Sequence, residues 1–365
     1  MLDFSLDYRP RLPAKTDYRI GCIGAGFIMR DVHLVAYQKA GFSVAAIASR
    51  TPAHAHLTAH MRGIPAVYDT WQELLTDDSI EILDIAFPPD QQLDIIREAV
   101  RQPHLKGILA QKPIAMNYAD AQEIVRLCDA SGKVLSVNQN MRYDQSMRAL
   151  KSVLDQGLLG RPVLATIEMR AIPHWQPFLR DYDRLTLLNM SIHHLDVMRY
   201  LFGDPERIFA SATRDPRTAF PHRDGIVLYI LEYANGLRAS AWDDVWTGPV
   251  REGAPGDLYI RWRVEGEDGM AHGTIGWVKF GDSDSQSTIE FTTKQQPGMW
   301  FRPCWQERWF PDAFIGTMAQ LMAAVQDDTE PEISGRDNLR TMALVEAAYR
   351  SIETRGSVAV AEITG

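Results

Sequence analysis

Apolar positions in the first 140 residues come in short runs separated by helical patterns. The runs have the length of buried strands, and apolar residues recur every three or four positions in the stretches between them. This alternation is typical of a parallel sheet with helices on both faces. The expected strands are residues 19–24, 44–49, 82–87, 107–110 and 134–137, and the clearest helices are residues 90–102 and 118–132.

The pattern changes after about residue 150. Apolar and polar residues now alternate over several segments, as in strands with one exposed face, and Asn235-Gly236 between two of them favours a hairpin. Helical patterns return later, which predicts an antiparallel sheet flanked by helices. The alternating segments are residues 162–170, 225–233 and 236–245, and the helical ones are residues 192–203, 311–326 and 337–353.

The change of pattern divides the chain of 365 residues into three parts. Residues 1–17 form an N-terminal arm, and residues 18–142 form a doubly wound α/β domain. Residues 143–365 form a second α/β domain with a large, mostly antiparallel sheet. The C-terminal helix is expected to be able to pack back toward the first domain.

Charge and cysteine content restrict the function classes. A net charge of -9 without a basic cluster argues against a nucleic-acid or anionic-membrane partner. Three scattered cysteines give no disulfide framework and favour a reducing compartment. The first residues lack the apolar run of a secretory signal, and no segment has the roughly 18 apolar residues that cross a bilayer. These features predict a soluble, cytoplasmic protein.

The sequence "IGCIGAGFIMRDVH", residues 20–33, has the form of a strand followed by a glycine-rich turn and a helix. Gly24 permits the tight turn, and Gly26 removes a side chain where a pyrophosphate would sit. Met29 occupies the third glycine position of G-x-G-x-x-G/A, which serves helix–strand packing. A wider gap between helix and sheet accommodates it, so the turn predicts a dinucleotide site. The alternative is that the turn serves helix–strand packing alone and binds no nucleotide.

The residues at the end of the second strand indicate whether NAD or NADP is the cofactor. An acidic residue there accepts hydrogen bonds from the adenosine ribose and favours NAD, whereas an arginine admits a 2′-phosphate. Here Ser49 and Arg50 occupy that place. A guanidinium can clamp a phosphate or stack on adenine. The pair therefore favours NADP over NAD, with a solvated loop cation as the alternative interpretation of Arg50.

Several motifs together resemble one family. They occur in the order and spacing of the Gfo/Idh/MocA oxidoreductases, and the resemblance extends over residues 18–362. It implies a Rossmann domain, a second α/β domain, and NAD(P)-dependent oxidation or reduction of a sugar, polyol or glycoside. It also implies a homodimer or homotetramer formed through the C-terminal sheet. The motifs are "GAGFI…H", "DIAFPPDQQLDIIREA", "AQKPIA", "NMRYDQSMRALKSVLDQGLLGRPV", "SIHHLDVMRYLFGDPERI" and "ALVEAAYRSIETRGSV".

Two family motifs are altered at their acidic positions. The run Gln111-Lys112-Pro113 matches E-K-P, and "NMSIH" places Asn189 and His193 at the aspartate and histidine of D-x-x-x-H. The resemblance implies that Lys112 and His193 are the catalytic residues. An imidazole titrates near neutral pH and suits transfer of the hydroxyl proton, while the lysine amine can hold the same oxygen.

The amides at positions 111 and 189 leave two interpretations of the function open. Either the acid/base pair is retuned for another substrate, or turnover is lost and the protein is a dinucleotide-sensing regulator. A third interpretation is an enzyme that recycles a tightly bound cofactor within one site. The cofactor-binding residues expected from the turn and the resemblance are Gly24, Gly26, Phe27, Ile28, Ser49, Arg50, Pro88, Gln111 and Lys112.

Substrate contacts are expected from three places: the end of the last Rossmann strand, an aromatic loop, and the segment around His193. The loop "AIPHWQPFLRDYDR" has the aromatic and polar groups that bind sugars, although a surface loop pinned by a tryptophan is the alternative. No metal is predicted, because the histidines of "HAHLTAH" fall on a helix away from the expected crevice. The substrate residues are Asn140, Arg142, His174, Trp175, Asn189 and His194.

Overall fold

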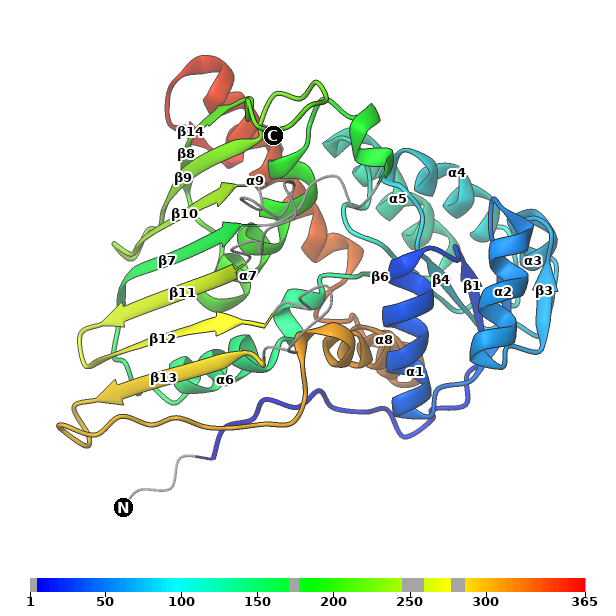
Figure 1. Ribbon diagram of the computed structural model, residues 1–365, viewed down its shortest axis with the longest axis horizontal. Helices are drawn as coiled ribbons and strands as arrows, with labels where there is room; N and C mark the ends of the chain where they lie inside the picture. Colours follow the sequence, from blue (N-terminus) through cyan, green and yellow to red (C-terminus); the bar gives the residue numbers. More distant parts are fainter. Residues whose placement is uncertain (1–4, 171–176, 245–258, 277–285, 365) are drawn as a thin grey trace. The chain divides into compact units, whose positions relative to one another are not determined.

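The computed structural model describes residues 5–170, 177–244, 259–276 and 286–364 (Figure 1). The chain forms two compact units. The first, called the Rossmann unit below, comprises Pro10–Tyr143 and Phe310–Met342. The second, called the sheet unit, comprises Met1–Arg9, Asp144–Trp309 and Ala343–Gly365.

The Rossmann unit contains a six-stranded parallel sheet in the order β3-β2-β1-β4-β5-β6. The order reverses between β1 and β4, which is where doubly wound folds bind their ligands. The doubly wound prediction is confirmed; the sequence pattern missed only β3, whose three residues are all half-buried. The strands are β1 Ile20–Ile23, β2 Val44–Ala48, β3 Ala66–Tyr68, β4 Ile82–Ile85, β5 Gly107–Ala110 and β6 Val134–Val137.

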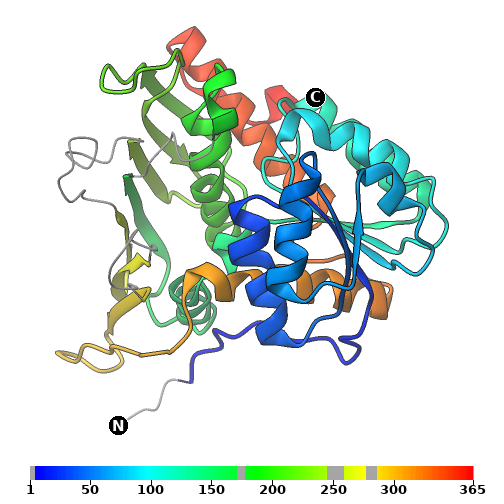
Figure 2. The same ribbon diagram turned by 45° about the vertical axis from the view of Figure 1, so that its right-hand side comes forward.

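Helices cover both faces of this sheet (Figure 2). Local capping explains where some begin. Thr70 and Glu73 form a capping box at the start of α3, and the Asn117 side chain accepts a hydrogen bond from the first turn of α5. The helices are α1 Leu34–Ala40, α2 Pro52–Arg62, α3 Trp71–Leu75, α4 Pro89–Ala99 and α5 Tyr118–Ser131.

A late segment of the chain completes the Rossmann unit. From Phe310 onward, α8 (Trp309–Asp327) packs closely against the sheet, since a methyl group at Gly107 would lie 2.9 Å from α8 side chains. After α8, the carbonyl of Ile333 accepts a hydrogen bond of 2.8 Å from the Val137 N–H at the end of β6. The first part of α9 (Gly335–Thr354) follows within the same unit.

The sheet unit contains an eight-stranded sheet in the order β13-β12-β11-β7-β10-β9-β8-β14. All neighbours are antiparallel except β7 and β10, which confirms the prediction of a large, mostly antiparallel sheet. The strands are β7 Pro162–Arg170, β8 Arg207–Thr213, β9 Ile226–Glu232, β10 Arg238–Asp244, β11 Tyr259–Gly266, β12 Gly269–Ile275, β13 Thr288–Thr293 and β14 Val358–Ala359. The Asn235-Gly236 turn joins β9 to β10, with Gly236 at φ 90°.

The two faces of this sheet differ. Helices α6 (Gln145–Asp155) and α7 (Ile192–Phe202) pack on one face (Figure 2). On the opposite face no helix of the described residues covers the strands, and large apolar side chains are 39–53% exposed. These side chains, called the outer apolar patch below, are Leu164, Phe209, Leu228 and Ile230.

Candidate functional site

The glycine-rich turn follows β1 in the Rossmann unit. Gly24 adopts φ +115°, and a Cβ there would lie 2.5 Å from the carbonyl oxygen of Ala86. Only glycine fits this close approach. A Cβ at Gly26 would meet nothing within 4 Å, so the space beside it is open. The turn therefore has the tight backbone and the free volume that a pyrophosphate requires.

Met29 is accommodated by an altered helix start. The chain enters α1 through a π-helical turn, Ile28–His33, and Met29 is fully buried within it. A π-helical turn holds one more residue than an α-helical turn and thus changes the spacing of side chains against the sheet. Phe27, which precedes this turn, is 38% exposed. The first helical turn thus differs in geometry from one built on a third glycine.

The residues expected to determine whether NAD or NADP binds directly follow β2. Ser49 is half-buried directly after the strand, and Arg50 is exposed. Thr51 then leads into α2. Neither Ser49 nor Arg50 is acidic, so the position that accepts from the ribose hydroxyls in NAD-specific sites carries a hydroxyl and a cation instead.

Lys112 lies in the loop that follows β5, at the carboxyl edge of the parallel sheet. Its desolvation lowers the pKa of the ammonium from 10.5 to about 7. Gln92 of α4 clamps this loop: its amide nitrogen donates to the carbonyl oxygens of Gln111 and Pro113, both at 2.9 Å. Its amide oxygen accepts from the Gln111 N–H at 2.9 Å. The lysine is thus carried by a fixed backbone.

Other residues predicted for the site lie in the same unit. Pro88 ends the loop after β4 and precedes α4. The Asn140 side chain donates to the Asn138 carbonyl at 3.3 Å. The Arg142 guanidinium donates to the Glu332 carbonyl at 3.1 Å and to the Asp337 carboxylate at 2.5 Å. Arg142 thereby connects the end of β6 to the start of α9.

His193 lies in the first turn of α7 in the sheet unit. Only 5% of it is exposed, and its ring meets the Trp309 ring edge-on at 6.1 Å between centroids. Asn189, four residues earlier, lies in a π-helical turn, Leu187–Ser191, that leads into α7. The backbone N–H of Asn189 donates to the Leu185 carbonyl at 3.1 Å.

A buried carboxylate anchors the residues on either side of His193. Nδ1 of His194 lies 2.8 Å from Oδ1 of Asp243 on β10, and the Ser191 hydroxyl donates to Oδ2 of the same residue. Asp243 and His194 are both fully buried. His194, predicted as a substrate contact, therefore also contributes to the packing that orients α7. His174 and Trp175 lie outside the described residues.

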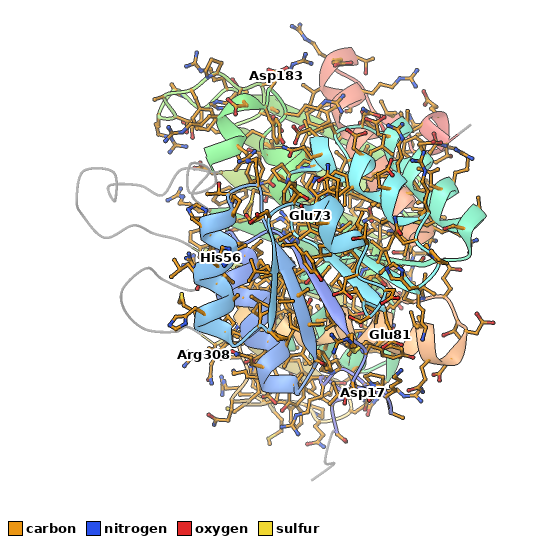
Figure 3. All side chains as sticks on the ribbon, turned by 90° about the vertical axis from the view of Figure 1, so that its right-hand side faces the viewer. Asp17, His56, Glu73, Glu81, Asp183 and Arg308 are labelled. Carbon is orange, nitrogen blue, oxygen red and sulfur yellow. The ribbon has the colours of Figure 1, made fainter. Side chains whose placement is uncertain are left out.

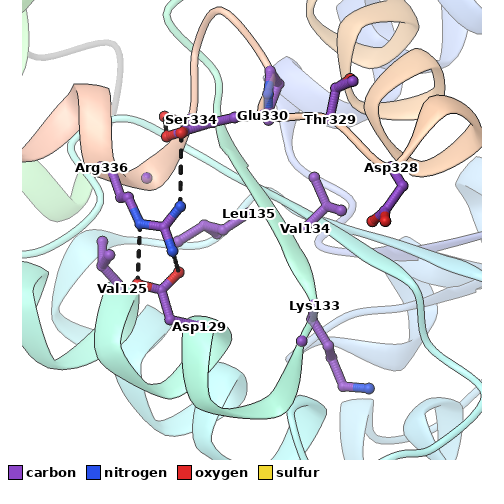
Figure 4. Close-up of a pocket in the computed structure, with 13 residues that line it drawn as sticks. Val125, Asp129, Lys133, Val134, Leu135, Asp328, Thr329, Glu330, Ser334 and Arg336 are labelled. Carbon is purple, nitrogen blue, oxygen red and sulfur yellow. Dashed lines mark hydrogen bonds and ion pairs between the residues drawn. The ribbon is translucent and has the colours of Figure 1, made fainter.

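One surface hollow of the Rossmann unit lies at the opposite edge of the sheet. It is lined by residues around the start of β6 and the connection from α8 to α9 (Figure 4). Arg336 lies between Asp129 and Glu330, at 3.0 Å and 3.6 Å. The Lys133 ammonium is bound by two backbone carbonyls, those of Gln102 and Leu105. Both cations that line the hollow, Arg336 and Lys133, are therefore already bound by protein atoms.

A metal centre is not formed by the part of the chain that the structure describes, where no three His, Cys, Asp or Glu side chains gather in a suitable group. His54, His56 and His60 are exposed on α2, and His56 lies on the outer side of that helix (Figure 3). Among the described helices, none combines the length and apolar character needed to cross a membrane.

Sequence reasoning missed the polar residues that support the site, above all His33, Asp84, Gln92 and Asp243. All four are fully buried. His33 closes the "GAGFI…H" motif, which is a signal that could have singled it out. The others stand in strands and helices whose apolar patterns give no sign of a polar role.

Comparison with known proteins identifies the family. Residues 18–139 match the GFO_IDH_MocA oxidoreductase family with its NAD-binding Rossmann fold, and residues 147–272 match the GFO/IDH/MocA C-terminal domain. A D-apiose dehydrogenase of Paraburkholderia graminis is 27% identical over 90% of this chain and 86% of its own. A myo-inositol 2-dehydrogenase of Thermotoga maritima is 25% identical over 83% of this chain and 86% of its own.

Solved structures show the same fold. An oxidoreductase from Agrobacterium radiobacter, in complex with NAD+, L-tartaric acid and magnesium, is 24% identical, with a TM-score of 0.81 over 95% of this chain and 100% of that chain. A levoglucosan dehydrogenase in complex with NADH has a TM-score of 0.79 at 18% identity, over 94% of this chain and 99% of that chain. With both regions of the sequence matched, the chain belongs to the Gfo/Idh/MocA family and is an NAD-binding oxidoreductase that acts on CH–OH groups.

Proposed function

We propose that the protein transfers a hydride between a nicotinamide and a secondary alcohol or ketone of a sugar, polyol or glycoside. Lys112 and His193 handle the hydroxyl proton in this proposal. The observation that carries it is the placement of Lys112 in the loop after β5 that Gln92 clamps, where desolvation lowers the pKa of the ammonium to about 7. An amine with this pKa exchanges protons at neutral pH. The D-apiose and myo-inositol dehydrogenases among the relatives support the substrate class.

The residues present fit a dinucleotide. Gly24 and Gly26 leave room for a pyrophosphate, and the cofactor, when bound, supplies the nicotinamide that exchanges the hydride. The sequence alone favours His193 for the hydroxyl proton, but the lowered pKa of Lys112 favours the lysine instead. In its neutral form, Lys112 accepts the proton of the reacting hydroxyl during oxidation. In the reduction direction the Lys112 ammonium returns it. His193 orients the same hydroxyl by a hydrogen bond and shares its proton.

The test is a cofactor titration followed by a screen of sugars, inositols, sugar acids and glycosides. We expect reduction of the nicotinamide, measured at 340 nm, with members of one class. Stoichiometric cofactor binding without turnover across the panel would contradict the proposal and favour a dinucleotide-sensing regulator. Cofactor that stays bound through purification, with turnover in its absence from the buffer, would favour an enzyme that recycles it.

We further propose that the cofactor is NADP, with the 2′-phosphate at Ser49 and Arg50. Replacing Arg50 with alanine removes a charge-assisted hydrogen bond, so the Kd for NADPH is expected to rise about tenfold while the Kd for NADH changes less than about twofold. Fluorescence titration measures both constants. Arg126→Ala on the exposed face of α5 is the control, and equal effects on the two cofactors would contradict the assignment.

We propose a homodimer or homotetramer formed through the outer apolar patch. Leu228 lies on β9 and, at 53%, is the most exposed side chain of the patch. Leu228→Asp places a charge among apolar side chains, and we expect a monomer in analytical ultracentrifugation where the parent protein is an oligomer. Leu57→Asp, at a similarly exposed position on α2, is the control. An unchanged oligomer in the Leu228 variant would place the interface elsewhere.

The cellular location is proposed from the cysteines. Cys22 and Cys128 are buried and Cys304 is exposed, and none of the three forms a disulfide. An exposed unpaired thiol is stable in a reducing compartment, where disulfides are rare. We therefore keep the cytoplasm as the proposed location.

A further inference from the structure

A chain of hydrogen-bonded polar groups connects β4 of the Rossmann unit to the loop that carries Lys112. Its centre is the His33 imidazole, which is fully buried. Nδ1 of His33 lies 2.8 Å from Oδ2 of Asp84 on β4. The Tyr37 hydroxyl donates to the same carboxylate oxygen at 2.6 Å. On the other side of the ring, Nε2 lies 2.9 Å from the amide nitrogen of Asn138 and 3.4 Å from that of Gln111.

The orientation of the Gln111 amide is fixed by its own loop. Its oxygen accepts a hydrogen bond of 2.9 Å from the backbone N–H of Lys112. The NH2 group must therefore face His33. Because an amide NH2 only donates, Nε2 of His33 must accept, and the ring proton must lie on Nδ1. In the tautomer that fits these contacts, Nδ1–H donates to Asp84 and Nε2 accepts from the amides.

The other groups around this ring bring no second charge. The Phe314 ring of α8 packs against it at 4.9 Å between centroids. Burial and the Asp84 carboxylate raise the pKa values of Tyr37 and Cys22 well above their usual values, so both stay protonated. Asp84 is then the single carboxylate in contact with His33 among the described residues.

We propose that Asp84, His33 and Gln111 form a hydrogen-bonded chain that positions the Lys112 loop, and that an amide at position 111 is what a neutral His33 requires. His33 and Asp84 are positioning residues, because they act on the lysine through Gln111. The inference rests on the proposed function for the role of Lys112. It assigns a reason to the exchange of the family glutamate for Gln111.

A glutamate at the half-buried position 111 would set a carboxylate oxygen against the Nε2 lone pair of the fully buried His33 ring. Like partial charges at this distance repel strongly where the dielectric constant is low. A second proton on His33 relieves the repulsion and creates an imidazolium between two carboxylates. The Gln111→Glu variant should therefore disturb the Lys112 loop at alkaline pH and less at acidic pH. Restoring the family motif is expected to lower activity.

The test compares the parent protein with Gln111→Glu by 15N NMR of labelled histidine and by kinetics from pH 6 to 8.5. The His33 signals are assigned with a His33→Gln variant. We expect the parent His33 as the neutral Nδ1–H form throughout, and a doubly protonated ring in Gln111→Glu at pH 7. We expect kcat of that variant to be about tenfold below the parent at pH 8.5, and to approach it at pH 6. Gln122→Glu, an exposed position on α5, controls for added charge.

A double variant keeps the proposal testable if Gln111→Glu folds poorly. Asp84→Asn combined with Gln111→Glu moves the negative charge from one side of His33 to the other. The ring can then donate from Nε2 to the glutamate and accept at Nδ1 from the asparagine. We expect folding and activity to recover, with the ring in its Nε2–H form. A double variant that is no better than Gln111→Glu would overturn the proposal.

Two further results would overturn it: a parent His33 in the Nε2–H or doubly protonated form, or a Gln111→Glu variant with the pH profile of Gln122→Glu. Failure of the proposed function gives a different outcome. In that case the parent protein oxidises no substrate, while the His33 tautomer and its change in Gln111→Glu are still those expected. The NMR spectra therefore test the hydrogen-bonded chain, and the turnover measurements test the proposed function.

Discussion

Replacing Lys112 with methionine is expected to lower kcat for alcohol oxidation by about 10²- to 10⁴-fold, the usual contribution of a general base. Methionine keeps much of the side-chain length and removes the amine. Cofactor affinity, measured by fluorescence titration, should fall far less than kcat, because the glycine-rich turn is intact even though one expected cofactor contact is lost. Steady-state kinetics on a substrate found in the panel measures the loss.

Lys106→Met is the matched control, since Lys106 stands just before β5 whereas Lys112 follows that strand. Its ammonium pairs with Glu81 at 2.7 Å on the surface, where such a pair contributes at most about 1 kcal/mol. Turnover should stay at the parent level. Equal activity of Lys112→Met and Lys106→Met would remove Lys112 from the reaction.

The pH dependence follows from the same lysine. Its pKa is about 7, so the amine is protonated below pH 7 and neutral above it. For oxidation, kcat/KM should rise through pH 7 to a plateau, because only the neutral amine accepts the hydroxyl proton. For reduction, kcat/KM should fall above pH 7, because the ammonium is the donor. If kcat/KM of the residual activity in Lys112→Met still changes near pH 7, a group other than Lys112 causes that pH dependence.

Replacing His193 with alanine is expected to lower kcat by about 10²-fold or more. The imidazole is almost fully buried, and its loss removes the hydrogen bond proposed to orient the reacting hydroxyl. The Kd of the cofactor is expected to change far less than kcat, because the glycine-rich turn proposed to bind the pyrophosphate is intact. The measurement is a pair of experiments on one variant, turnover and cofactor titration.

His272→Ala on β12 is the control, since this histidine packs on the Trp300 ring at 5.4 Å between centroids. A Lys112→Met/His193→Ala double variant should lose little more than the worse single variant, because residues that act on one proton are not additive. Unchanged hydride transfer in both single variants would remove the proposed acid/base pair altogether.

Much of the fold could be predicted because the segments that form it carry their own patterns. The run at 107–110 became β5 with the same bounds, and 162–170 became β7. Short elements were not predicted: the three residues of β3 are half-buried and show no alternation of apolar and polar residues. The turn at Ile28–His33 was not predicted either, because apolar spacing does not distinguish a π-helical turn from the start of an α-helix.

The site was predicted less completely, for a physical reason. Gly24 and Lys112 stand in recognisable local motifs. The support of Lys112 depends on side chains from different segments, such as Gln92 on α4 and Asp84 on β4, which come together only after the sheet has formed. A lowered pKa likewise depends on packing around the amine, which no spacing of residues along the chain encodes.

The contribution of residues 310–342 to the Rossmann unit has a consequence for synthesis on the ribosome. An emerging chain that ends at Tyr143 has all six parallel strands, yet β6 lacks the Ile333 carbonyl and β5 lacks the cover of α8. Such an edge invites pairing with other chains. The nascent Rossmann unit therefore lacks these contacts until about two hundred further residues have been translated, and its sheet edge is exposed to chaperones during that interval.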